Sequence, residues 1–156
     1  MIKYLLSIIC VFFIVVDSND ATAQQTKQPV KWEFNATKVV DNVYALTFEA
    51  NIDEGWYLYS QNIGEGGPIP TTFRFDENPN IELLSRVQES GDPKKGFDQL
   101  FEMDIIKYAK KVNFVALIKV KDPTTTLKGF VKSMSCNAMS CLPPKEVSFE
   151  LDFLRL

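Results

Sequence analysis

The sequence alternates between apolar and polar residues with a period of two over much of its length. In residues 43–52 every second side chain is apolar, and residues 112–120 and 147–153 repeat the pattern. Successive side chains of a β-strand point to opposite faces, so this period predicts strands with one buried face. Shorter strands are predicted at residues 31–36, 56–60, 71–75, 81–87 and 129–135. Seven or eight short strands separated by turns predict an all-β fold, an antiparallel β-sandwich.

Residues 91–111 fit two local structures. Their apolar side chains could line one face of a short amphipathic helix, or they could belong to a strand followed by a loop. The side chains in question are Phe97, Leu100, Phe101, Ile105 and Tyr108. The sequence leaves both alternatives open.

The N-terminus has the pattern of a secretory signal peptide. Lys3 precedes an apolar run at residues 5–16, and a polar stretch then ends in Ala21-Thr22-Ala23, a small-x-small cleavage pattern. The run is shorter than the roughly 20 residues that a membrane-spanning helix needs. We therefore expect residues 1–23 to be a cleaved signal peptide and residues 24–156 to form one exported domain.

Charge and composition exclude several functions. Removal of residues 1–23, with one basic and two acidic side chains, changes the net charge from −3 to −2. This weak negative charge gives no electrostatic reason to expect nucleic-acid binding. The chain has no histidine, so it lacks both the usual base of a serine or cysteine nucleophile and the commonest zinc ligand. We expect no metal and no cofactor.

Two cysteines remain in the predicted mature chain. Cys10 leaves with the signal peptide, whereas Cys136 and Cys141 lie five positions apart and precede Pro143 and Pro144. In an exported protein such a pair is expected to form a disulfide. A loop this short stabilises a fold by only about 2 kcal/mol in the chain-entropy model, compared with about 4.7 kcal/mol for a loop near 100 residues. The pair is therefore either a small structural staple or a reversible redox switch.

Three segments carry a resemblance to a known family. Residues 134–147 read MSCNAMSCLPPKEV, residues 55–60 read GWYLYS and residues 66–73 read GGPIPTTF. These segments resemble the N-terminal periplasmic domain of the thiol:disulfide interchange protein DsbD. The resemblance implies an immunoglobulin-like sandwich in the periplasm, acting as a component of a protein-disulfide reductase.

The resemblance also implies roles for particular residues. Cys136 and Cys141 are the expected redox pair, and Pro143 and Pro144 are expected to hold Cys141 as the attacking thiol. Tyr57 and Tyr59 match strand tyrosines near the pair. An aromatic residue of a cap loop is expected to cover the disulfide, with Phe97 as the first candidate and Phe101 as the second.

The expected partners are thioredoxin-like redox proteins of the envelope. Because the chain stops at Leu156, without the membrane and thioredoxin-like domains of full-length DsbD, we expect its membrane-linked electron donor to be another polypeptide. The alternative function is an exported binding or assembly module with a purely structural disulfide. Trp56, Tyr57 and Tyr59 could form the binding surface of such a module if they were exposed.

Overall fold

The described part of the computed structural model, residues 27–155, is built from ten strands, and the predicted signal peptide lies outside it. In chain order the strands are β1 (Val30–Val40), β2 (Val43–Ile52), β3 (Tyr57–Tyr59), β4 (Thr72–Phe75), β5 (Ile81–Leu83), β6 (Gln88–Asp98), β7 (Met103–Val120), β8 (Thr126–Ser133), β9 (Ser135–Cys136) and β10 (Lys145–Asp152), followed by a 3₁₀ helix at Phe153–Arg155. No helix in this part of the chain is long and apolar enough to span a membrane.

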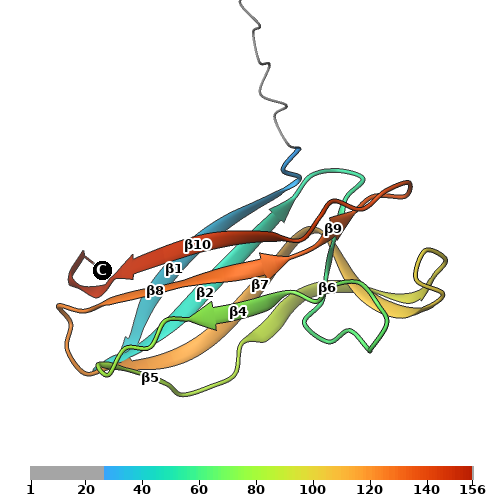
Figure 1. The fold of residues 1–156 in the computed structure, drawn as a ribbon. Helices are drawn as coiled ribbons and strands as arrows, with labels where there is room; N and C mark the ends of the chain where they lie inside the picture. The colour runs from blue at the N-terminus through green and yellow to red at the C-terminus, as the bar shows by residue number, and fades with distance from the viewer. Residues whose placement is uncertain (1–26, 156) are drawn as a thin grey trace, which may run out of the picture.

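The strands form two antiparallel sheets that pack face to face (Figure 1). The smaller sheet has the order β10-β8-β4. The larger sheet has the order β1-β2-β7-β3-β9. Strands β3 and β2 pair with successive segments along one edge of β7, and β6 and β5 pair with its opposite edge. The predicted antiparallel sandwich is confirmed. The sheet order makes β7 the central strand, with β3 between it and the strand that carries Cys136.

The long strand β7 is interrupted by a backbone irregularity. Lys110 has a left-handed backbone (φ 65°) and lies between the segment that pairs with β3 and the segment that pairs with β2. On the opposite edge, the β6–β7 register shifts between Gly91 and Pro93. Residues 91–111 therefore form the end of a strand, a turn and the beginning of the next strand. The helical alternative for this segment is excluded.

The main core is largely aromatic. The Phe48 ring is fully buried at its centre, and ring centroids of both sheets lie within 4.9 to 5.9 Å of it. These neighbours are Phe34, Phe73 and Phe149. Burial of such rings is the largest favourable contribution that a sandwich of this size can make to its stability. The main core contains neither cysteine.

A second, smaller cluster lies at one end of the sandwich. It consists of Tyr59, Ile105 and Cys136, with Phe101 and Cys141 packed against it. Figure 1 shows β9 and the tip of the β6–β7 hairpin at this end, opposite the C-terminus. The two cysteines and the hairpin tip are therefore brought together away from the main core.

Candidate redox site

Cys136 and Cys141 form a disulfide in the structure. Cys136 is 2% exposed at the end of β9, whereas Cys141 is only partly buried. The two residues also form an isolated antiparallel bridge. Cys136 thus belongs to the protein interior, and Cys141 is the more exposed residue of the pair.

The segment between the cysteines, here called the cysteine turn (residues 136–141), is closed by hydrogen bonds. Asn137 donates its amide to the Ser140 carbonyl (2.9 Å), and its side-chain Oδ1 accepts from the amides of Met139 and Ser140 (2.8 Å each). The Leu142 amide donates to the Ser135 carbonyl (2.9 Å). An asparagine that binds its own turn in this way is a typical local stabiliser. These bonds close the turn in addition to the disulfide.

Strand β3 lies directly beside Cys136. Tyr57 is the register partner of Cys136, and Leu58 is the partner of Ser135. Tyr59 is 1% exposed and belongs to the cluster that contains Cys136. Burial, and then the nearby charge of Asp98, raises the pKa of Tyr59 to about 12, so this hydroxyl stays protonated at neutral pH.

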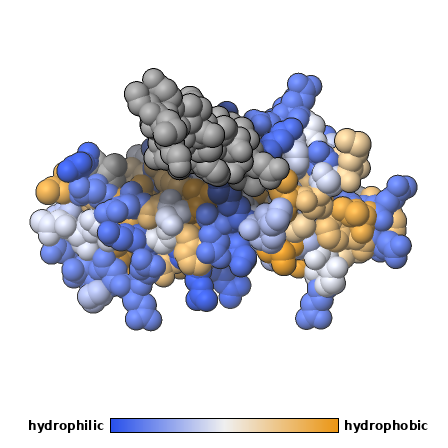
Figure 2. Space-filling model, turned by 45° about the horizontal axis from the view of Figure 1, so that its top comes forward, coloured by the Kyte–Doolittle hydropathy of each residue, from blue (hydrophilic) through white to orange (hydrophobic). Residues whose placement is uncertain are grey.

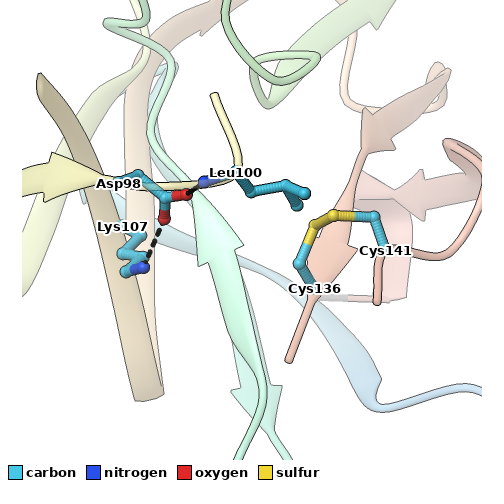
Figure 3. Close-up of polar contacts among 5 residues, drawn as sticks. All are labelled: Asp98, Leu100, Lys107, Cys136 and Cys141. Carbon is cyan, nitrogen blue, oxygen red and sulfur yellow. Dashed lines mark hydrogen bonds and ion pairs between the residues drawn. A yellow bond between two sulfur atoms is a disulfide. The ribbon is translucent and has the colours of Figure 1, made fainter. Parts of the chain in front are cut away.

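The tip of the β6–β7 hairpin, residues 99–102, approaches the disulfide and is here called the hairpin turn. The Phe101 ring packs edge-on against Tyr59, with centroids 5.8 Å apart. Phe97, on β6, is 67% exposed. The side chain of Leu100 is 61% exposed, and Figure 3 shows it directed from the hairpin turn toward the two sulfurs. Of these three side chains, Leu100 was not expected from the sequence.

An ion pair between Asp98 and Lys107 lies at the base of the hairpin turn. The Lys107 ammonium lies 2.7 Å from Asp98 Oδ2, and the Leu100 amide donates to Asp98 Oδ1 (3.0 Å) (Figure 3). Burial opposes ionisation of Asp98, but the hydrogen bonds from Lys107 and from the Leu100 amide outweigh it and lower the pKa of this carboxyl. Asp98 therefore stays ionised to a lower pH than an isolated carboxyl would.

Pro143 and Pro144 follow Cys141 on the outside of the sandwich. Both are exposed, and together with Leu142 and Trp32 they line a mostly apolar groove of about 310 Å³. Neither proline has an amide hydrogen, and both have restricted backbone angles. They therefore separate the cysteine turn from β10 without extending the sheet.

A polar network anchors the far end of β3. The Glu89 carboxylate accepts hydrogen bonds from Ser60 Oγ (2.8 and 2.9 Å), from the Tyr108 hydroxyl (2.7 Å) and from the Gln61 amide. Ser60 is fully buried and follows Tyr59 directly. Burial, followed by the bond to Glu89, raises the pKa of Tyr108. The network ties the short strand beneath Cys136 to β6 and β7.

Sequence reasoning missed four residues of the site: Asn137, Leu100, Asp98 and Lys107. Asn137 and Asp98 each accept an amide two residues ahead, a local pattern that Asn and Asp favour in turns. That pattern could have indicated both turns. Leu100 is directed toward the disulfide, and Lys107 toward Asp98, only through the β6–β7 pairing, which has no short sequence motif.

A comparison with protein families matches residues 22–152 to the family described as thiol:disulfide interchange protein DsbD, N-terminal. The match covers most of the chain, and the chain belongs to this family. The family's chemistry is thiol-disulfide interchange, and the disulfide described above lies inside the matched region. A comparison with curated proteins gave no match.

Solved structures of related domains have the same fold. The N-terminal periplasmic domain of ScsB from Proteus mirabilis is 18% identical with a TM-score of 0.61, and the match covers 82% of this chain and 48% of that one. The chain thus spans about half the length of that structure. The reduced N-terminal domain of DsbD from Neisseria meningitidis is 18% identical with a TM-score of 0.52, covering 80% and 85%. These similarities confirm the predicted immunoglobulin-like sandwich.

Proposed function

We propose that Cys136 and Cys141 are the redox-active pair of a periplasmic thiol-disulfide exchange domain. Membership of the DsbD N-terminal family supports the chemistry. The observation that carries the assignment to this pair is its place: the disulfide closes a turn outside the main core, with Cys136 buried and Cys141 partly exposed. A bridge in such a position can open and close while the sandwich stays intact.

The proposed cycle transfers two electrons. In the reduced protein the Cys141 thiolate attacks a partner's disulfide, so that a Cys141–partner bond forms and one partner sulfur leaves as a thiolate. Cys136, as a thiolate, then attacks the Cys141 sulfur and releases the second partner sulfur. The partner gains two electrons and two protons, and the Cys136–Cys141 disulfide is restored. A thiol donor reverses the same steps and reduces the pair again.

The burial of the two cysteines supports these roles. Cys141 is the more exposed residue, and Pro143 and Pro144 restrict the backbone that follows it. Cys136 is held at 2% exposure by its pairing with Tyr57, which suits a residue that attacks only within the protein. Cys141 is therefore the proposed attacking residue and Cys136 the resolving residue.

A cover over the disulfide is part of the proposal. Leu100, whose side chain is directed toward the sulfurs, takes the covering role expected of an aromatic ring, and Phe101 anchors the hairpin turn on Tyr59. Phe97 is 67% exposed and is assigned no covering role. Figure 2 shows hydrophobic residues gathered on the right, the side on which Figure 1 shows β9 and the hairpin tip. An apolar rim of this kind suits contact with another protein.

The proposed partners are thioredoxin-like proteins of the envelope, and the proposed donor is a membrane-linked protein on another chain. We also propose that residues 1–23 act as a cleaved signal peptide and residues 24–156 as the mature domain. The alternative, a binding module with an aromatic surface, loses support because Trp56 and Tyr59 are buried at 6% and 1% exposure. Only Tyr57 of that set is partly exposed.

Trapping of mixed disulfides tests this function. Cys136→Ser cannot resolve the intermediate, so it should accumulate disulfide-linked partners through Cys141, visible on a non-reducing gel of envelope proteins. Cys141→Ser should trap less, and the variant with both serines should trap nothing. The redox function is contradicted if neither single variant captures a protein while both are folded and exported. Stronger trapping by Cys141→Ser would reverse only the two roles.

A further inference from the structure

Lys107 contacts both the base of the hairpin turn and strand β3 beneath Cys136, in addition to the packing of Phe101 on Tyr59. The Lys107 ammonium lies 2.7 Å from Asp98 Oδ2 and 4.7 Å from the centroid of the Tyr57 ring. The first contact reaches the base of the turn that carries Leu100, because Asp98 also accepts the Leu100 amide. The second contact reaches the register partner of Cys136. Lys107 therefore connects the turn that carries Leu100 with the strand that pairs with Cys136.

This connection is better shielded than an ordinary surface ion pair. The side chains of Asp98 and Lys107 are 12% and 25% exposed, whereas the other ion pair on β7, Lys111 with Glu49, has a lysine that is 53% exposed. Water screens a shielded pair less. The lowered pKa of Asp98 agrees with a carboxylate that is held in its charged form by its partners.

We propose that Asp98 and Lys107 are positioning residues whose ion pair holds Leu100 over the Cys136–Cys141 disulfide and thereby limits the rate at which the disulfide is attacked. The inference deepens the proposed function, since thiol-disulfide exchange is the reaction that the cover would control. Breaking the pair frees Asp98 from Lys107, loosens the hairpin turn and exposes the sulfurs. The pair then acts on access to the site, while neither residue takes part in the exchange itself.

Reduction of the oxidised protein by dithiothreitol measures this access. In the reaction a dithiothreitol thiolate attacks one cysteine sulfur, and its second thiol closes a cyclic disulfide, so that both cysteines are released reduced. The second-order rate constant is measured at fixed pH and ionic strength by quenching and thiol labelling. We expect Asp98→Asn and Lys107→Met each to raise it by about fivefold, roughly the population change that loss of one effective ion pair produces.

The two substitutions separate positioning from simple electrostatics. Asp98→Asn removes a negative charge and Lys107→Met removes a positive one, so a direct field effect on the attacking thiolate would change the two rates in opposite directions. Loss of the Asp98–Lys107 ion pair, by contrast, should raise the rate constant of reduction in both variants. Lys111→Met is the matched control, because it removes the same charge from β7 by breaking a pair of the same length (2.7 Å). Its rate should stay within about twofold of the wild type.

A combined variant tests whether the pair acts through Leu100. Leu100→Ala alone should raise the rate about as much as Asp98→Asn, and the double variant should be no faster than either single variant. Rates equal to wild type in Asp98→Asn and Lys107→Met, opposite changes in the two, or effects that multiply with Leu100→Ala would each overturn the proposal. If circular dichroism shows that one charge variant does not fold, the other charge variant combined with Leu100→Ala still tests whether the ion pair acts through Leu100.

The outcome is independent of the trapping experiment. Dithiothreitol needs no docking surface, so its rate constants of reduction do not depend on whether a protein partner is trapped. Failure to trap a partner would contradict the proposed function and leave these rate constants unchanged. Conversely, unchanged reduction rates would remove the positioning roles of Asp98 and Lys107 while trapping through Cys141 could still succeed.

Discussion

Reduction of the disulfide should leave the sandwich folded. The bridge closes a loop with a sequence separation of 5, for which the chain-entropy model gives about 2 kcal/mol. The cysteine turn is also closed by hydrogen bonds that Asn137 Oδ1 accepts from the amides of Met139 and Ser140 and by the bond that the Leu142 amide donates. The main core contains neither sulfur. We therefore expect the free energy of unfolding to fall by about 2 kcal/mol on reduction, a fraction of the 5 to 15 kcal/mol typical of domains.

Urea unfolding followed by circular dichroism measures this difference. The oxidised protein, the reduced protein and the variant with both cysteines replaced by serine should all show a cooperative transition. Phe48→Ala in the oxidised protein is the comparison, because truncation of a fully buried ring costs about 3 to 5 kcal/mol, more than loss of the bridge. Unfolding of the protein on reduction, or a loss larger than that of Phe48→Ala, would refute the reasoning and favour a structural staple.

Three further predictions concern stability. Glu89→Ala leaves two hydroxyls and an amide without their acceptor and should cost about 3 kcal/mol in urea unfolding, whereas the exposed control Glu82→Ala should change it by less than about 0.5 kcal/mol. Gly129→Ala should cost about 3 kcal/mol, because an added Cβ would overlap the Arg74 carbonyl oxygen; a stability equal to wild type would contradict this close strand packing. The pKa of Asp98 is lowered by folding, so its contribution is complete above the unfolded pKa of about 3.9 and is lost as pH falls through the folded value. The stability difference between wild type and Asp98→Asn should therefore be constant near pH 6 and vanish in strong acid, and a difference that persists there would contradict the assignment.

The strand pattern was readable where each strand has one buried and one exposed face. Residues 43–52 alternate without interruption, and β2 has those bounds. The beginning of β7 could not be read in this way, because the alternation changes phase between Ile105, which packs in the smaller cluster with Cys136, and Tyr108, which packs in the main core. Ile105, Tyr108 and Val112 are all buried, and their spacing of three and four positions resembles one face of a helix.

The site was predictable only where its residues are close in the sequence. Cys136 and Cys141 lie in one turn, and their disulfide follows from spacing and export. The positions of Leu100 and Lys107 depend on the register of the β6–β7 hairpin and on the contact of β7 with β3, a strand distant in the sequence. Local patterns carry no information on such contacts, so the sequence did not indicate that the Leu100 side chain is directed toward the sulfurs.

The reduction potential of the Cys136–Cys141 pair tests the central claim most directly. The protein is equilibrated with glutathione or thioredoxin buffers of known potential, and the reduced fraction is read by thiol labelling. An exchange-active pair should have a potential more oxidising than about −300 mV, so that thioredoxin-like proteins can reduce and oxidise it. A value below about −300 mV would identify a structural disulfide and contradict the proposed exchange function.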